Sequence, residues 1–238
     1  MQGDYRAWQA FDGANIPSSL ELQEDLFSWL KPSHRLIDLG CGYGKTCFDL
    51  LQRGYHQITG VDLNESGIRH AQLLKDSAPT DAALDFHTDD VTQLSLADSS
   101  FDFAIMQALL TALPKAQDRA RALGEASRVL VPGGYLYIAC FAQTWHSPVY
   151  RKRYLDGIAA GFEEGSFPAY NKETGELEYV AHHHSERELV DLLIGADFEI
   201  ESFRFDVFTT RSGNRINGVV LIARNAKPAG SAGRDDPA

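Results

Sequence analysis

A glycine-rich turn follows the first apolar run of the chain, 34–39. It is Asp38-Leu39-Gly40-Cys41-Gly42-Tyr43-Gly44, and a helical pattern begins directly after it. Glycines at alternate positions let the backbone approach a ligand without Cβ clashes, at the edge where open α/β sheets bind ligands. A merely tight connection is the alternative. Because Lys45 stands where a dinucleotide-binding turn places its third glycine, and Asp38 offers a carboxylate, the turn favours a ligand with a cationic group.

A second carboxylate, Asp62, ends the next predicted strand, 57–61. It follows the turn by about 20 residues, a spacing at which a carboxylate can accept hydrogen bonds from both hydroxyls of a ribose. The turn and Asp62 together therefore indicate a nucleoside-containing ligand.

Four segments, taken in their order along the chain, resemble the class I S-adenosylmethionine-dependent methyltransferases. They are the glycine turn, Gly60-Val61-Asp62-Leu63, Asp90-Val91-x-x-Leu94 with the 98–102 stretch, and 128–134. The resemblance implies S-adenosyl-L-methionine as methyl donor and S-adenosyl-L-homocysteine as product. For Asp90, a turn cap is the alternative. The resemblance also implies a set of cofactor contacts: Asp38, Gly40, Cys41, Gly42 and Gly44 at the methionine moiety, Asp62 at the ribose, Leu63, Asp90 and Val91 at the adenine, and Gln107 near the sulfonium.

Short apolar runs alternate with longer helical patterns along the chain. Several runs are apolar throughout, which indicates a parallel sheet covered by helices on both faces. We expect an α/β fold with a doubly wound, mostly parallel sheet. The resemblance implies seven strands, an antiparallel C-terminal strand and a lid insertion. The predicted strands are 34–39, 57–61, 83–87, 101–106, 135–141, 198–208 and 216–223, and the predicted helices are 22–30, 45–53, 65–75, 115–129, 147–160 and 185–194.

The expected organisation is a single methyltransferase domain over residues 1–224. Ser18 and Glu21 form a capping box for the helix of the N-terminal flap. The composition after Arg224 turns to Ala, Pro, Gly and Asp, which predicts a disordered tail over 225–238. The parts of the domain are an N-terminal helical flap (1–33), a cofactor-binding core (34–141), a substrate lid (142–184), and a C-terminal helix and hairpin (185–224).

The expected methyl transfer requires few catalytic groups from the protein. Methyl transfer from a sulfonium is an in-line displacement, so the chain has to align and desolvate the acceptor and remove a proton where one must leave. In the lid, His146 is a candidate general base, and Trp145 and Tyr150 are expected to contact the substrate. A loop histidine without a role is the alternative for His146.

Three consecutive histidines precede the last predicted helix. Side chains alternate along an extended segment, so His182 and His184 share a face while His183 points away. No Cys, Asp or Glu partner stands at a recognisable ligand spacing, so we predict no metal site. His182 and His184 are further candidates for catalysis or substrate contact. The alternative is that they only lead into the helix capped by Ser185.

Basic and aromatic residues elsewhere are candidates for the acceptor pocket. If the run 198–208 is parallel to the first five strands, the loop after it emerges at the cofactor edge, where Arg211, Asn214 and Arg215 would border the pocket. Tyr5, with Trp8, is expected to fold over the site. The cluster 151–153 could hold an anionic substrate, but a solvated helix face is the favoured interpretation.

The overall charge restricts the classes of partner. With 22 Lys and Arg against 33 Asp and Glu, the formal charge is −11. This argues against nucleic acid and anionic membranes, which need clustered cations. No apolar run approaches the roughly 20 residues of a membrane span, and the start lacks a signal-peptide pattern. The three cysteines suit a reducing compartment, so we expect a cytoplasmic monomer or homodimer.

The leading hypothesis is a methyltransferase that acts on an oxygen, nitrogen or sulfur atom of a small molecule under the lid. A protein or RNA methyltransferase is an alternative within the same family. A protein that binds S-adenosylmethionine without methyl transfer is an alternative from another class. A nicotinamide-dependent oxidoreductase is disfavoured by Lys45.

Overall fold

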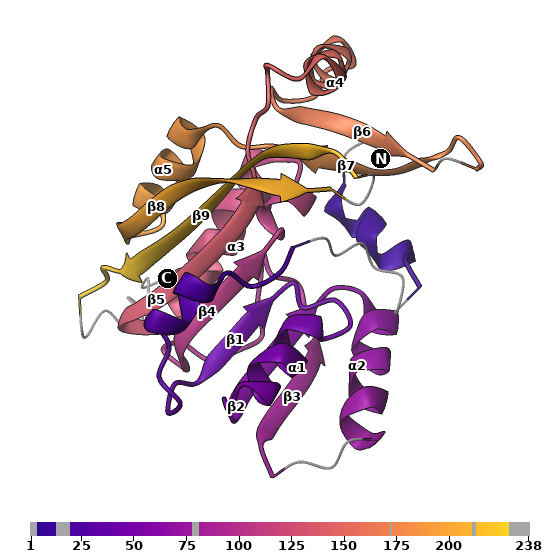
Figure 1. Cartoon of the computed structure of the whole chain (residues 1–238). Coiled ribbons are helices and arrows are strands. Elements are labelled where there is room, and N and C mark those ends of the chain that lie inside the picture. Colours follow the sequence, from indigo (N-terminus) through magenta and orange to yellow (C-terminus); the bar gives the residue numbers. More distant parts are fainter. Residues whose placement is uncertain (1–3, 13–19, 78–80, 172, 211–212, 229–238) are drawn as a thin grey trace, which may run out of the picture.

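The computed structural model describes residues 4–12, 20–77, 81–171, 173–210 and 213–228, and its central element is a seven-stranded sheet (Figure 1). The strand order is β3-β2-β1-β4-β5-β9-β8. All pairings among β1 to β5 are parallel, whereas β9 is antiparallel to β5 and to β8. The predicted doubly wound, mostly parallel sheet is confirmed. Its strands are β1 (Leu36–Leu39), β2 (Gln57–Asp62), β3 (Ala83–Thr88), β4 (Phe101–Gln107), β5 (Leu130–Phe141), β8 (Phe198–Thr209) and β9 (Arg215–Asn225).

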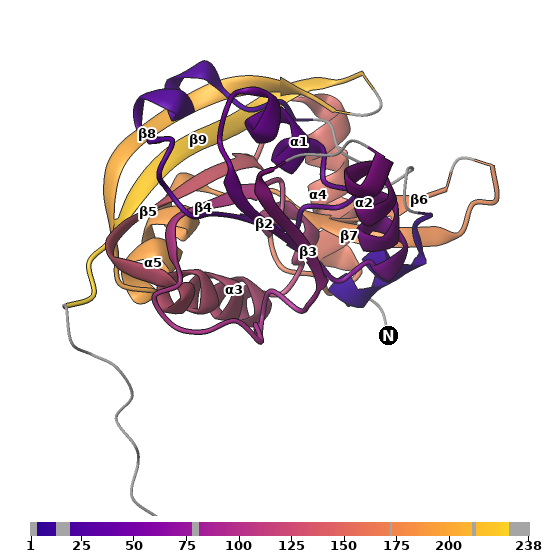
Figure 2. The same cartoon turned by 90° about the horizontal axis from the view of Figure 1, so that it is seen from below.

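Helices cover both faces of the sheet (Figure 2). The core on one face contains residues of α3 (Ala116–Val129) and α5 (Glu186–Gly195), and the core on the other face contains residues of α1 (Lys45–Gln52) and α2 (Glu65–Ser77). Successive side chains of a strand point to opposite faces. Ile37 therefore belongs to the first core and its neighbour Leu36 to the second, and both are buried.

The direction of β8 determines where its loop emerges. Because β8 is antiparallel to β9 and β9 is antiparallel to β5, β8 runs parallel to the first five strands. The loop that follows Thr209 therefore lies at the carboxyl edge of the sheet, together with the loops after β1, β2 and β4. The expectation that Asn214 and Arg215 border the acceptor pocket depended on this parallel direction of β8.

The segment 142–184 forms a helix and a hairpin. The predicted helix is α4 (Pro148–Ala159). The rest of the segment, for which no strand was predicted, contains β6 (Ser166–Tyr170) and β7 (Leu177–His182), paired antiparallel. The hairpin lies beyond the carboxyl ends of β1 and β4 (Figure 1). Sequence patterns missed it because the strands are short and one contains Pro168, which is tolerated where the strand has a free edge. The hairpin is stabilised by its packing on α4.

The N-terminal segment packs against this hairpin. It contains the short 3₁₀ helix η1 (Tyr5–Ala10), whose N-terminus is capped by the Asp4 carboxylate accepting from the Arg6 N–H. The rings of Trp8 and Phe11 pack against Tyr179 of β7, with centroids 4.5 Å and 6.0 Å away. The predicted flap is therefore joined to the segment 142–184 by aromatic contacts.

Some predicted boundaries were wrong. The helix expected over 22–30 is only the 3₁₀ helix η3 (Glu24–Ser28), and its N-cap residue, Gln23, makes no side-chain capping bond. Ser18, the predicted cap, lies outside the described residues. The strand expected from Tyr135 begins already at Leu130.

The predicted tail begins too early. Asn225 is the last residue of β9 and is buried, and its side-chain amide donates to the carbonyl oxygens of Ser127 and Leu130. Of the rest of the predicted tail, 229–238 lies outside the described residues.

Within the part of the chain that the structure describes, no helix combines the length and the apolar character that crossing a bilayer requires.

The close contact between α4 and the hairpin at Gly157 can be tested by substitution. A Cβ at this position would collide with the backbone carbonyl oxygen of Ser166, whereas a Cβ at Gly124 in α3 meets nothing within 4 Å. We expect Gly157→Ala to lower the free energy of unfolding by about 1–3 kcal/mol through overpacking. The control Gly124→Ala should leave the free energy of unfolding unchanged or raise it by up to about 1 kcal/mol. Urea denaturation measures both, and equal effects of the two substitutions would contradict this packing.

Candidate active site

The glycine turn adopts a backbone that only glycine tolerates well. Gly40, Gly42 and Gly44 have φ angles of 79°, 57° and 85°, in the left-handed region that disfavours side chains. A Cβ on Gly40 would lie 2.9 Å from Leu109 Cδ1, and a Cβ on Gly44 would lie 2.9 Å from the ring of Phe86. The turn therefore packs tightly against the loop after β4 and against β3, with Gly44 as the N-cap of α1.

The Asp62 carboxylate joins the loops after β1 and β2. Its Oδ2 accepts from the Gly42 N–H and its Oδ1 accepts from the Asn64 N–H, both at 2.8 Å. Burial raises the pKa of this carboxyl, and the two backbone hydrogen bonds offset only part of the increase. Each oxygen keeps a further lone pair, and Asp62 lines a cavity.

Asp38 and Cys41 lie beneath the turn rather than at the cavity. Asp38 is buried, and its Oδ2 accepts a weak bond from the Cys47 thiol at 3.6 Å. Burial raises the pKa of Asp38 to about 7. Burial also raises the pKa of Cys41 well above its usual value, so its thiol is not ionised at neutral pH. Among the described residues, Asp38, Cys41, Gly42 and Gly44 are not part of the cavity wall.

A cavity of about 930 Å³ extends from the carboxyl edge of the sheet to the hairpin. One part is lined by residues that the resemblance assigned to the cofactor: Gly40, Asp62, Leu63, Asp90, Val91 and Gln107. The other part is lined by residues of segment 142–184 and its surroundings, including Phe141, Tyr150, Arg153, Phe167, Tyr179 and His183. The structure thus brings the six cofactor candidates together with a largely aromatic wall.

Asp90 is held in place by two neighbours. The Tyr5 hydroxyl donates to Asp90 Oδ2 at 2.7 Å, and Oδ1 accepts from the Thr92 N–H and hydroxyl. Burial alone raises the pKa of Asp90, but these hydrogen bonds outweigh it and the net pKa is lowered. Tyr5 itself lines the cavity, and so does Trp8. Two residues of the N-terminal segment therefore lie at the cavity wall, beside Asp90.

Two buried polar atoms at the cavity residues have no partner in the described part of the chain. Gln107 donates its amide to the Leu20 carbonyl oxygen, while its Oε1 accepts nothing. The Trp8 indole N–H likewise has no acceptor. Buried polar groups are normally paired, so an orphaned acceptor and an orphaned donor fit a ligand that carries both kinds of group, as S-adenosylmethionine does.

The predicted bases are placed away from the cavity. His146 is exposed, and His182 and His184 are buried with rings 4.7 Å apart on the side that faces α5. As the alternation of side chains predicted, His183 points the other way, and it lines the cavity. Of these four histidines, the structure therefore brings only His183 to the cavity, and His183 was not among the predicted bases.

Of the other substrate candidates, some line the cavity and others do not. Tyr150 lines the cavity, whereas Trp145 packs on Tyr154 and donates its N–H to Gln143 Oε1. From the loop after β8, Thr210 lines the cavity but Asn214 and Arg215 do not. Arg211 lies outside the described residues.

His182 and His184 meet a carboxylate that the sequence analysis missed. His182 Nε2 lies 3.0 Å from the Glu188 carboxylate, and the buried Arg119 guanidinium donates to the same carboxylate at 2.9 Å. His182, His184 and Glu188 present ligand atoms within 4.8 Å of one another. The absence of a metal stays a prediction, and the fixed cation Arg119 already satisfies the Glu188 charge.

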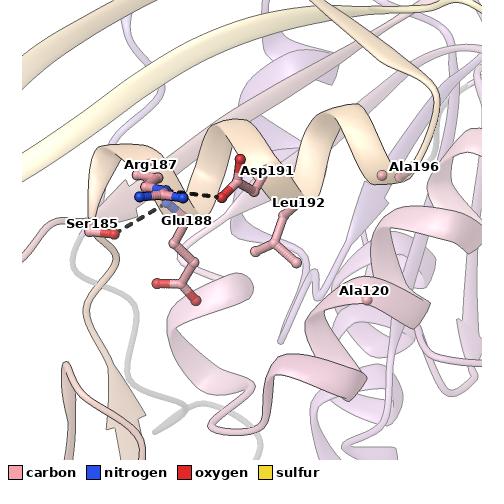
Figure 3. Close-up of a pocket in the computed structure, with 8 residues that line it drawn as sticks. Ala120, Ser185, Arg187, Glu188, Asp191, Leu192 and Ala196 are labelled. Atoms are coloured by element: carbon pink, nitrogen blue, oxygen red, sulfur yellow. Dashed lines mark hydrogen bonds and ion pairs between the residues drawn. The ribbon is translucent and has the colours of Figure 1, made fainter.

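Glu188 also borders a second, shallower pocket of about 490 Å³ between α3 and α5 (Figure 3). On its α5 side, Arg187 pairs with Asp191, and the Ser185 hydroxyl accepts from the Glu188 N–H, which closes the predicted N-cap. None of its described lining residues belongs to the cofactor candidates. The larger cavity, which six of the cofactor candidates line, is therefore the candidate active site.

Several cavity residues were missed by sequence reasoning. Asn64 lines the cavity, and its Oδ1 accepts from the Gly67 N–H at the start of α2. An Asn before Glu65 is a recognisable N-cap signal. Arg153 lines the cavity from α4, although a solvated helix face was the favoured interpretation. No local signal distinguishes Arg153 from its exposed neighbours Arg151 and Lys152.

Asp38→Asn tests the buried carboxyl beneath the turn. The pKa of Asp38 is raised to about 7 in the folded chain, so its contribution to stability is present below about pH 4 and is lost as the pH rises through about 7. We expect Asp38→Asn to gain on the order of 4 kcal/mol relative to wild type over this range, at about 1.4 kcal/mol per pH unit. Urea denaturation across this pH range measures the gain.

The control is Asp85→Asn, which changes an exposed carboxylate of β3 that pairs with Lys75. Its unfolding profile should run parallel to that of the wild type. A profile of Asp38→Asn that is parallel to the wild type would show that the buried carboxyl does not titrate in this range.

Comparison with known proteins identifies the family. Residues 37–138 match the family model of the methyltransferase domain. The structure is similar to a solved SAM-dependent methyltransferase of Methanosarcina mazei, with a TM-score of 0.84 and 43% identity over 88% of this chain and 100% of that one. The ubiquinone/menaquinone biosynthesis C-methyltransferase UbiE of Roseobacter denitrificans is 33% identical over 135 residues, which are 56% of this chain and 52% of that protein.

A third relative is a protein methyltransferase. The eEF1A lysine and N-terminal methyltransferase of Danio rerio is 30% identical over 121 residues, which are 50% of this chain and 17% of that protein. The chain thus spans about half or less of the length of these two curated relatives. The strand order, the glycine turn above α1 and these matches lead to one conclusion: the chain belongs to the class I S-adenosylmethionine-dependent methyltransferases, enzymes that use S-adenosyl-L-methionine and release S-adenosyl-L-homocysteine.

Proposed function

We propose that this methyltransferase acts on a small molecule that binds between the sheet edge and the segment 142–184. The observation that carries the proposal is the single cavity of about 930 Å³ that runs from Asp62 and Asp90 to the aromatic wall of this segment. The volume lies in the range of small-molecule pockets, and the wall combines aromatic side chains with polar and charged ones, which suits a small organic ligand that carries polar groups. The methyl group moves to an oxygen, nitrogen or sulfur atom of the acceptor by in-line displacement.

The cofactor contacts follow the residues that line the first part of the cavity. Asp62, already fixed by two backbone N–H groups, accepts from the ribose hydroxyls with its remaining lone pairs. Leu63 and Val91 pack on the adenine, and Asp90 accepts from its amino group. Gln107 and the backbone of Gly40 contact the methionine moiety, where the unpaired Gln107 Oε1 accepts from the ammonium group.

Asp38 stabilises the same ammonium group from a distance. Its carboxylate lies beneath the turn and is not part of the described cavity wall. It therefore acts through the geometry of Gly40, Gly42 and Gly44, and a bound cation would favour the ionised form of its carboxyl. This assignment replaces the direct contact that the resemblance suggested.

S-adenosyl-L-methionine supplies a methyl group on a positively charged sulfur, so the protein needs no nucleophile of its own. The chain contributes alignment and the exclusion of water. Phe141, Tyr150 and Phe167 form the apolar wall that does both. None of the three proposed bases, His146, His182 and His184, lines the cavity. An acceptor that arrives deprotonated, or that loses its proton to solvent, fits this arrangement.

Asp62→Ala tests the cofactor assignment. Loss of a carboxylate that hydrogen-bonds a ligand costs about 1.5–3 kcal/mol, so we expect the affinity for S-adenosyl-L-homocysteine to fall by at least about tenfold. Isothermal titration calorimetry measures it. The control Asp85→Ala removes an exposed carboxylate of neighbouring β3 and should bind as the wild type does. Unchanged affinity in Asp62→Ala would contradict the assignment.

A labelled methyl donor tests the acceptor class. The chain is incubated with phenols, amines, thiols, carboxylates and an activated carbon acceptor, the last because the UbiE relative is a C-methyltransferase. Protein extracts and RNA are tested in parallel, since another relative is a protein methyltransferase. We expect label in a small molecule. Label only in protein or RNA would overturn the proposal, and binding without any transfer would favour a sensor.

A further inference from the structure

Arg153 projects a positive charge into the part of the cavity formed by segment 142–184. Its guanidinium lies over the rings of Tyr150 and Phe167, at 4.9 Å and 5.5 Å from their centroids. Among the ion pairs of the described residues, none includes Arg153, and the nearby Asp156 is paired with Lys152. Arg153 is thus the one Lys or Arg in the described cavity wall, and it faces the cavity without a carboxylate partner.

His183 supplies a second hydrogen-bond donor in the same corner. The Tyr154 hydroxyl oxygen accepts from the Thr144 N–H at 3.1 Å and lies 2.8 Å from His183 Nδ1, to which the hydroxyl donates in one tautomer of the imidazole. The proton of a neutral His183 is then on Nε2. Burial lowers the pKa of His183 to about 3. The ring is therefore uncharged at neutral pH and presents an N–H rather than a basic nitrogen.

The two donors share their aromatic neighbours. His183 stacks on Tyr150 at 5.3 Å and meets the edge of Phe167 at 4.9 Å, the same two rings that Arg153 covers. The corner formed by Arg153, His183, Tyr150 and Phe167 therefore combines a guanidinium and a neutral N–H with apolar walls. Donors that lie in an apolar environment favour an ionised oxygen acceptor, because a charge-assisted hydrogen bond is strong there.

A cationic acceptor fits this corner poorly. Aromatic rings attract ammonium groups, but here the faces of Tyr150 and Phe167 are already covered by the protein's own guanidinium. Apart from the cofactor candidates, the cavity wall contains three carboxylates: Glu173 and Glu178 of the hairpin, which lie several residues along the chain from His183, and Asp156 of α4, which pairs with Lys152. Among the described residues, none of these carboxylates forms an ion pair with Arg153.

We propose that the acceptor carries a carboxylate next to an aromatic or similarly planar apolar group, and that Arg153 and the His183 Nε2–H bind this carboxylate. The proposal rests on the proposed function, because it assumes that the cavity holds the methyl acceptor. It assigns Arg153 and His183 to acceptor recognition and replaces the interpretation of Arg153 as part of a solvated helix face.

Paired probes test the proposal by binding alone. Benzoate, phenylacetate and indole-3-acetate are each compared with the corresponding primary amide by calorimetry, on the full chain saturated with S-adenosyl-L-homocysteine. A charge-assisted hydrogen bond is worth about tenfold or more in affinity. We expect at least one acid to bind about tenfold more tightly than its amide. Equal binding of acids and amides, tighter binding of benzylamine, or no binding of any acid at millimolar concentration would overturn the proposal.

Three variants assign the preference to the corner. Arg153→Met should weaken acid binding by about tenfold or more and change amide binding little. His183→Phe, which keeps the stacked ring and removes the donor, should also reduce the preference. The control Arg151→Met removes an exposed cation of the same helix and should retain it. An acid preference that survives in Arg153→Met would overturn the assignment.

Two further measurements separate this proposal from the proposed function. Affinity for S-adenosyl-L-homocysteine should be unchanged in all three variants, which also shows that they fold. Methyl transfer is scored independently with the acceptor panel. Transfer to a small molecule without any acid preference overturns the carboxylate assignment alone. Acid preference without transfer to any small molecule leaves the corner as a binding site and overturns the proposed reaction.

Discussion

The site depends on the hydrogen bonds that fix Asp62 and Asn64 at the end of β2. Asp62 holds the glycine turn through the Gly42 N–H and holds Asn64 through its N–H. The buried Asn64 side chain in turn donates to the carbonyl oxygens of Trp8 and Phe11. Trp8 packs on Tyr179 of the hairpin. A continuous series of contacts therefore joins the glycine turn to the hairpin that covers the cavity, so the two parts of the cavity wall are positioned relative to one another.

The hairpin has a second anchor on its other side. Arg119, buried in α3, donates to Glu163 and Glu188, and Glu188 also contacts His182 of β7. Ser166 of β6 lies 2.7 Å from His182 Nδ1. A buried guanidinium is costly unless its charge is paired, and two carboxylates pair it here. His182 thus holds the segment 142–184 against α5, His184 lies against the Phe141 carbonyl oxygen of β5, and His183 faces the cavity.

The charges in the cavity differ between its two parts. Around the cofactor residues the ionisable groups are carboxylates, Asp62 and Asp90, which suit a ligand with positive charge. Under α4 the wall contains Arg153, which forms no ion pair among the described residues, and Asp156, which pairs with Lys152, beside a histidine that burial keeps neutral. A net charge of −11 therefore says little about the acceptor. Each part of the cavity wall therefore favours a ligand group of a different charge.

The sequence by itself determined the cofactor half of the protein. Alternating glycines, a carboxylate at the end of β2 and apolar runs separated by helical patterns are local signals, and each depends on residues close in the chain. The tertiary structure alone decided the acceptor half. The strands 166–170 and 177–182 form because they pack on α4 and against Trp8 and Phe11. Their register decides that His183 faces the cavity while His182 and His184 face α5, and sequence spacing could predict that alternation but not which face would meet the site.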